Sequence, residues 1–129
     1  TLHDYGTFSI WHREADLYLI DLQTMDVKWL PLNSNESESY HSWSSNGRWI
    51  VFSSKRLDGL TARPFISYFV SSDSVGKPFV LPQKDPTLYK RMEKTINRPE
   101  FVQSIPESGP RDFMKASLKT PQKAIWIGK

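Results

Sequence analysis

Residues 40–53 read YHSWSSNGRWIVFS, and this stretch sets the interpretation of the surrounding chain. Two short runs rich in aromatic and β-branched residues flank the dipeptide Asn46-Gly47. An Asn-Gly pair accepts the positive φ angles of a tight turn, and it is the strongest short signal for a β-hairpin. The stretch therefore predicts two antiparallel strands, at 40–43 and 48–53, joined at this turn.

The same pattern of β-prone runs and polar turns continues on both sides of the hairpin. In residues 15–22, Leu17 and Leu19 point to one face of the predicted strand, and Tyr18 and Ile20 point to the other. Because both faces are apolar, this strand is expected in a sheet that is covered on both sides. An all-β fold follows, with further strands predicted at 7–11, 15–22, 27–30, 64–70 and 77–81.

Two segments of the chain align loosely with each other. Residues 8–32 and residues 49–82 each run through a strand, a polar hairpin, a long apolar strand, a turn and a short strand that ends in Leu-Pro. Phe8 aligns with Trp49, and this offset falls in the period of about 40–45 residues that is typical of propeller blades. The pattern predicts antiparallel four-stranded propeller-blade sheets, about two blades in all, with a partial blade at about 7–32 and a blade at 40–82.

The stretch 40–53 resembles the repeat of TolB-type β-propellers, a WD-type repeat whose motif runs roughly Pro-x-Trp-Ser-Pro-Asp-Gly-Lys-x-Ile-Ala-Phe-x-Ser. Residues 17–22 (LYLIDL) resemble the third strand of that repeat, and the resemblance covers about residues 7–82. In this chain Ser45 stands where the family has Pro, Asn46 replaces Asp, and Arg48 replaces Lys. The residues that form the repeat motif here are Trp43, Ser44, Asn46, Gly47, Arg48, Ile50, Phe52 and Ser53.

The resemblance implies a non-catalytic binding or scaffold module, the C-terminal portion of a propeller in the periplasm or at the envelope of a bacterium. Propellers bind a protein or ligand partner through loops at the mouth of a central channel, so function belongs to those loops rather than to the fold. Inner strands line the channel, which makes His41 a weak candidate for a ligand-facing residue. A structural role for His41 is the favoured interpretation.

Two alternative functions stay open. One is the accessory propeller of a prolyl-oligopeptidase-type peptidase, which requires a hydrolase domain with a Gly-x-Ser-x-Gly motif that this sequence lacks. The other is a carbohydrate-binding propeller, which requires exposed and coplanar aromatic rings. The aromatic residues are expected mainly in the core; they are Trp29, Tyr40, Trp43, Trp49, Phe65, Tyr68 and Phe69.

Composition and motifs restrict the chemistry further. The sequence has no cysteine, which excludes disulfides and cysteine-based zinc sites. It lacks HExxH and a phosphate-binding loop, while the Ser-x-x-Lys spacing at Ser74 and Lys77 lies in a loop without companion motifs. We therefore expect no catalytic residue, metal or cofactor. No run of the sequence approaches the roughly 20 apolar residues of a membrane-spanning helix, so no membrane span is expected.

The net charge of +3 is unevenly distributed over the 129 residues. Residues 1–82 carry nine acidic and seven basic side chains, whereas residues 83–129 carry five acidic and ten basic ones. The basic residues are dispersed, which is typical of a solvated surface, and nucleic acid is not expected as a partner. Residues 83–129 are interpreted as a basic C-terminal extension with a short helix at about 86–95 and poor order within 104–122.

The length of the chain is the last constraint. A closed propeller needs at least four blades, or roughly 160 residues and more. The chain is therefore expected to be part of a larger propeller, whose remaining blades or another protein are its partners. Uncovered sheet faces should make the isolated piece self-associate.

Overall fold

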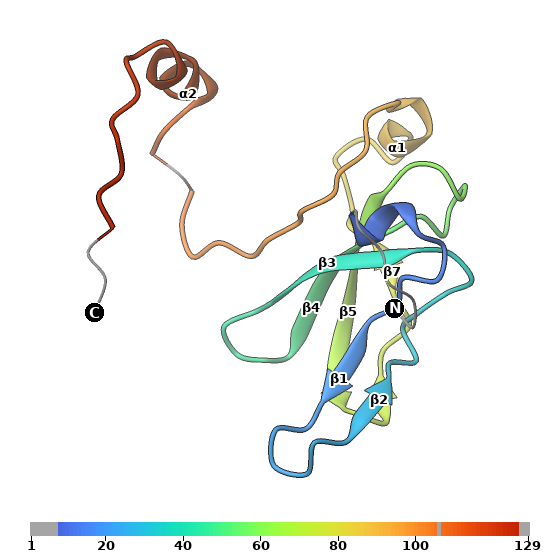
Figure 1. Ribbon diagram of the computed structural model, residues 1–129. Coiled ribbons are helices and arrows are strands. Elements are labelled where there is room, and N and C mark those ends of the chain that lie inside the picture. Colours follow the sequence, from blue (N-terminus) through green and yellow to red (C-terminus); the bar gives the residue numbers. More distant parts are fainter. Residues whose placement is uncertain (1–7, 106, 127–129) are drawn as a thin grey trace.

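The protein is built mainly from two antiparallel β-sheets with a few short helices, in agreement with the all-β prediction (Figure 1). The computed structural model describes residues 8–105 and 107–126. The elements in chain order are η1 (Ser9–Trp11), β1 (Tyr18–Ile20), β2 (Val27–Trp29), β3 (Glu38–Trp43), β4 (Trp49–Ser54), β5 (Arg63–Ser71), β6 (Ser74–Val75), β7 (Phe79–Val80), α1 (Leu88–Arg91) and α2 (Pro110–Ser117).

The larger sheet is a meander in which β3, β4 and β5 pair in sequence order. The short strands β6 and β7 both pair with β5, β6 near its C-terminal end and β7 near its N-terminal end. They therefore act as one outer strand, interrupted between Val75 and Phe79. Pro78 lies in the interruption, and its missing N–H removes a donor that a continuous edge strand would use.

The hairpin between β3 and β4 forms at the predicted Asn-Gly turn. Gly47 has φ +65°, and the Asn46 side-chain oxygen accepts the Arg48 N–H at 3.0 Å. The Ser44 hydroxyl accepts the Trp49 N–H at 2.9 Å, so this side chain takes the place of a backbone acceptor at the turn. The turn chemistry read from the sequence is confirmed at these residues.

The smaller sheet pairs β1 with β2 and packs on one face of the larger sheet. Leu17 and Leu30, next to its strands, are buried against the meander. The shared core of the two sheets consists of Leu17, Leu30, Leu32, Ile50, Phe52 and Phe65. One face of the larger sheet is thus covered by the β1–β2 pair, as the apolar character of these strands requires.

The opposite face of the larger sheet is covered by the chain that follows α1. The Ser53 hydroxyl donates to the Ile96 carbonyl at 2.7 Å, and the Ile96 N–H donates to the Ala62 carbonyl at 2.9 Å. The Ala62 N–H in turn donates to the Thr95 hydroxyl at 2.9 Å. These bonds hold residues 95 and 96 beside β4 and the residue that precedes β5.

The structure differs from several expectations. The strand expected at 15–22 spans only Tyr18–Ile20. The strand expected at 7–11 is wrong over residues 8–11, where Ser9–Trp11 is a 3-10 helix; residue 7 lies outside the described residues. The helix expected at 86–95 spans only Leu88–Arg91. A helix that was not expected, α2, begins at Pro110 in the Pro/Ser/Gly-rich segment, where the Asp112 carboxylate accepts the Gly109 N–H at 2.9 Å.

Local hydrogen bonding explains these differences. The Trp11 N–H donates to the Phe8 carbonyl, and the His12 N–H donates to the Ser9 carbonyl. Alternating residues become a strand only beside another strand, and here the backbone donors close a local turn instead. In α2, Pro at the first helical position and an acidic residue two positions later stabilise a helix start that apolar periodicity does not reveal.

The C-terminal segment leaves the sheets after the residues that cross them. In Figure 1 the coloured chain that follows α1 leads away from the body of the molecule, and α2 lies apart from both sheets. All residues from 110 to 126 are exposed. Within the described part of the chain, no helix is long and apolar enough to cross a membrane.

Candidate functional site

The most irregular backbone of the larger sheet lies in the middle of β3. The register with β4 shifts between Ser39, which pairs with Ser53, and Ser42, which pairs with Val51. Two residues of β3, Tyr40 and His41, therefore lie opposite one residue of β4, which is the arrangement of a β-bulge. Tyr40 has φ +50°, an uncommon value for a residue with a side chain.

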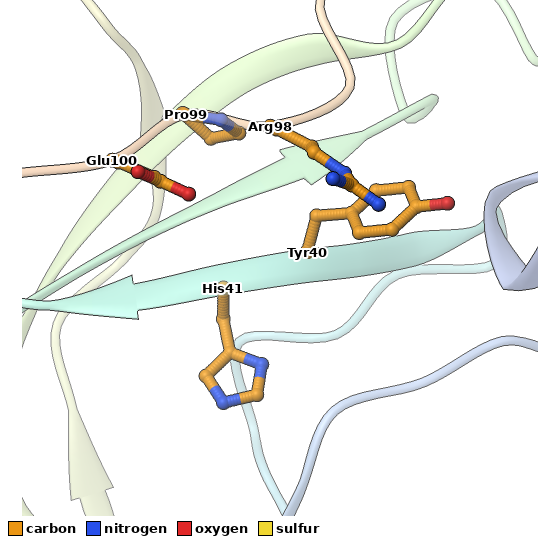
Figure 2. Close-up of a pocket in the computed structure, with 5 residues that line it drawn as sticks. All are labelled: Tyr40, His41, Arg98, Pro99 and Glu100. Atoms are coloured by element: carbon orange, nitrogen blue, oxygen red, sulfur yellow. The ribbon is translucent and has the colours of Figure 1, made fainter. Parts of the chain in front are cut away.

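The bulge separates the Tyr40 and His41 side chains. The Tyr40 ring lies beneath the guanidinium of Arg98, whose central carbon is 5.3 Å from the ring centroid. Figure 2 shows the His41 imidazole on the other side of β3, pointing away from Arg98 and Tyr40. Because β-bulges redirect side chains at functional sites, this position is the principal candidate site of the structure.

Two hollows adjoin the Tyr40–Arg98 pair. The smaller one has a volume of about 140 Å³ and is lined by Tyr40, His41, Arg98, Pro99 and Glu100 (Figure 2). The larger one has a volume of about 350 Å³ and is lined by Phe8, Ile10, Trp11, Tyr40, Asn97 and Arg98. Both hollows bring together segments far apart in the sequence, which is why pattern reasoning could not locate them.

His41, the candidate from the sequence, is exposed on β3 and borders the smaller hollow. Its imidazole does not point toward the cation–π pair. Among the described residues, no group of three or more His, Asp or Glu side chains is placed to hold a metal ion.

The residues of the repeat motif have packing and turn roles. Trp43 is half-buried and meets Phe69 edge-on, with ring centroids 4.9 Å apart. Ile50 and Phe52 are buried in the core. Arg48 is exposed, and its backbone N–H completes the turn. These residues build the hairpin and the core below it.

The aromatic residues are divided between core and surface. Phe65 is buried, Trp43 and Phe69 are half-buried, and Trp29 is 49% exposed. The two most exposed neighbouring rings near a hollow, Phe8 and Trp11, meet at 73°. Flat sugar rings stack on parallel or coplanar aromatic faces, so this pair does not favour carbohydrate binding.

Two buried charged groups escaped the sequence interpretation. The first is Glu38, which is 1% exposed and forms an ion pair with Arg56 at 2.9 Å. Its carboxylate also accepts the hydroxyls of Ser34 and Ser54, both at 2.7 Å. The Arg56 guanidinium packs over the Phe65 ring at 4.7 Å. Glu38 follows a polar stretch of the sequence, and charged residues in such stretches are usually exposed. The sequence therefore did not predict that Glu38 is buried.

The second is Arg63 at the start of β5, which is 3% exposed. Its guanidinium donates to the carbonyls of Lys94 at 2.6 Å and Tyr89 at 3.2 Å, and also to that of Met92. Within the described ranges, the ion pairs do not include Arg63. The carbonyls around the end of α1 therefore balance its charge, and Arg63 attaches α1 to the sheet.

Asp58 and Tyr89 border one hollow of about 440 Å³, whereas the other groups with a shifted pKa lie apart from it. Against the opposing effect of burial, hydrogen bonds from the Thr61 hydroxyl and from the Thr61 and Leu60 N–H groups lower the pKa of Asp58. Hydrogen bonds from the Gln23 and Thr24 N–H groups lower the pKa of Asp21, and the Thr87 hydroxyl and N–H lower the pKa of Asp85. Burial raises the pKa of Tyr89, against the opposing effect of a hydrogen bond from Gln83. Acid–base catalysis needs perturbed groups that converge on one site, and the Asp21 and Asp85 carboxylates do not, because they belong to two separate turns.

No family model, curated protein or solved structure significantly matches this chain. Its function is therefore argued from its own residues and geometry.

Proposed function

We propose that the chain is part of a TolB-like β-propeller of the bacterial envelope and acts as a non-catalytic binding module. The repeat motif and the meander of β3, β4, β5 and the interrupted outer strand support this proposal, because a propeller blade is a four-stranded antiparallel meander. Remaining blades of the same propeller, or another protein, are the proposed partners.

The observation that carries the proposal is the outer face of the β1–β2 sheet. Tyr18 lies opposite Trp29, and Ile20 lies opposite Val27. Residues that are directly opposite, or two apart on one strand, share a face, so these four side chains form one apolar ladder. Their exposed fractions are 40% for Tyr18, 49% for Trp29, 50% for Ile20 and 60% for Val27.

The ladder is the face opposite to the one buried by Leu17 and Leu30. A sheet with two apolar faces, of which one is open, is suited to stacking between two other sheets. Propeller blades stack in this way around an axis, and a contiguous exposed apolar surface marks an interaction site. The ladder is thus the proposed surface for the next blade, and for a second copy when the chain is studied by itself.

Self-association of the purified 129-residue chain tests this use of the ladder. We expect a dimer or higher oligomer in sedimentation velocity, and we expect the double variant Ile20→Ser/Val27→Ser to shift it to monomer. Phe113→Ser, which changes an exposed apolar residue of α2, is the matched control and should leave the oligomer intact. A monomer at high micromolar concentration would contradict the proposal.

The cellular context is tested separately. An antibody raised against the chain should detect, in fractionated cells of the source organism, a protein larger than 15.0 kDa in the periplasmic or envelope fraction. A band of 15.0 kDa confined to the cytosolic fraction would contradict the assignment to an envelope propeller.

A further inference from the structure

The larger hollow beside Tyr40 combines an apolar floor with unused hydrogen-bond donors. Phe8 and Trp11, which are 58% and 65% exposed, form one wall with their rings 5.7 Å apart. Ile10, buried beneath them, belongs to the same lining. Asn97 and Arg98 supply the polar side. A mainly apolar hollow with a few convergent polar groups is the usual form of a small-ligand site.

The guanidinium of Arg98, an exposed side chain, lies over the Tyr40 ring and donates no hydrogen bond to another described residue. The Tyr40 ring contacts one flat face of the guanidinium, so the N–H groups at its edge stay free to donate. None of the ion pairs between described residues includes Arg98. The bonds that fix residues 95 and 96 to the sheet position this arginine over the bulge.

Asn97 adds a second donor on the same side. Its side-chain oxygen accepts the Thr95 hydroxyl at 3.1 Å, which orients the amide nitrogen as the remaining donor. Among the described residues, no carboxylate lines this hollow, whereas Glu100 lines the smaller hollow beside Pro99. The polar side of the larger hollow therefore carries one positive charge and amide N–H groups, and it suits an anion.

We propose that the larger hollow binds a carboxylate carried on an aromatic group, as at the C-terminus of a peptide that ends in an aromatic residue. The planar guanidinium of Arg98 matches a planar carboxylate with two parallel N–H···O bonds, and Asn97 adds a third donor. The aromatic group of the ligand packs against Trp11 and Phe8. The volume of about 350 Å³ lies at the lower end of small-ligand sites, which fits one aromatic residue with its terminal carboxylate.

This inference deepens the proposed binding role by naming a ligand class, but it does not depend on the ladder of β1 and β2. The hollow is formed by η1, the β3 bulge and residues 97–98, and it contains none of the ladder residues. Failure of ligand binding would leave the self-association experiment unaffected, and the reverse also holds.

Titration of the full chain with N-acetyl-L-phenylalanine, followed by ¹H–¹⁵N NMR, tests the proposal. We expect a dissociation constant of about 1 mM, with the largest shifts at Trp11, Asn97 and Arg98. N-acetyl-L-phenylalaninamide, which lacks the carboxylate, should bind at least ten-fold more weakly. Equal affinity for the acid and the amide, or shifts that cluster elsewhere, would overturn the proposal.

Variants distinguish the specific contribution of the Arg98 guanidinium to binding from a general effect of the positive charge of the chain. Arg98→Gln should weaken binding of N-acetyl-L-phenylalanine at least ten-fold, and Trp11→Ala should weaken it several-fold. Arg111→Gln, an exposed arginine on α2 outside the hollow, is the matched control and should bind as the parent chain does. Unchanged affinity in Arg98→Gln would refute the role of the guanidinium.

Two further measurements complete the test. Asn97→Asp places a negative charge in the hollow, so it should also weaken binding of the carboxylate. This variant tests the proposal independently if Arg98→Gln fails to fold. Phenyl phosphate should bind no more tightly than N-acetyl-L-phenylalanine, because a dianion loses more hydration free energy than a monoanion when it enters the hollow. Tighter binding of phenyl phosphate would overturn the carboxylate assignment.

Discussion

Single residues in this protein act through backbone conformation and through buried charge. Gly47 has a positive φ at the tip of the β3–β4 hairpin, a conformation that residues with a Cβ adopt at a cost. Glu38 illustrates buried charge, because every acceptor contact of its carboxylate comes from a neighbouring hydroxyl, N–H or guanidinium. Each of these positions gives a prediction with a distinct physical cause.

Substitution of Gly47 measures the free-energy cost of the positive φ angle at this position, separate from steric contacts. A Cβ at this position would meet no atom within 4 Å, so steric contact contributes nothing. Gly47→Ala should therefore lower the free energy of unfolding by about 1 kcal/mol, which is the cost of the left-handed conformation. Gly47→Asn should lower it less, since Asn tolerates this conformation. Urea denaturation measures both variants, and equal losses would contradict the explanation.

Removing one partner of the buried ion pair should be costly. Glu38→Ala leaves the Arg56 guanidinium without its carboxylate in a site that is mostly shielded from water, and we expect a loss of about 3–5 kcal/mol in unfolding free energy. Lys28→Ala is the control, because the Lys28–Asp73 pair is solvent-exposed and such pairs contribute about 1 kcal/mol or less. Similar losses in the two variants would contradict the distinction between buried and exposed pairs.

Elements of this protein are stabilised by tertiary contacts more than by their own sequence. Helix α1 has only four residues, fewer than an isolated helix needs, and its end is held by the Arg63 guanidinium. The strands β6 and β7 exist because β5 offers each of them a pairing partner, β6 near its C-terminal end and β7 near its N-terminal end. Short elements of this kind are weakly specified by local propensity, which explains why the predicted 86–95 helix was too long.

The attachment of α1 through Arg63 gives a prediction at this scale. Arg63→Met keeps much of the apolar volume but removes the donors to the Tyr89, Met92 and Lys94 carbonyls. We expect faster hydrogen exchange at the Lys90 and Met92 amides, while the amides paired between β4 and β5 keep their protection. Lys90→Met, which changes an exposed residue of the same helix, should leave the exchange of α1 unchanged. Unchanged exchange in Arg63→Met would show that other contacts hold the helix.

The whole molecule combines a covered sheet with an open one. The larger sheet has β1 and β2 on one face and residues 95–98 on the other, whereas the β1–β2 sheet keeps its apolar ladder exposed. Residues 110–126 are exposed throughout. The extension after residue 82 thus has two parts with different roles, one that completes the fold and one that lies outside it.

Two truncations test this division. Ending the chain after Ser104 should change the unfolding free energy by no more than about 0.5 kcal/mol, because the described residues that it removes are exposed, apart from the half-buried Gly109. Ending it after Pro82 removes the carbonyls that balance Arg63 and the segment bonded to Ser53, and it should cost at least about 3 kcal/mol. Urea denaturation followed by circular dichroism measures both. Equal stability of the two truncated chains would show that the sheets fold without residues 83–104.

The sequence by itself determined the parts of this protein that depend on local chemistry. Asn46-Gly47 specified a hairpin because Gly47 adopts a positive φ that few other residues accept, and alternating apolar residues specified antiparallel strands. The apolar character of Tyr18 and Ile20 already indicated a strand with two apolar faces. Only the tertiary structure decided which face is covered, that η1 replaces a strand, and that Arg98 lies over Tyr40. These outcomes depend on contacts between distant segments, whose energies no local pattern contains.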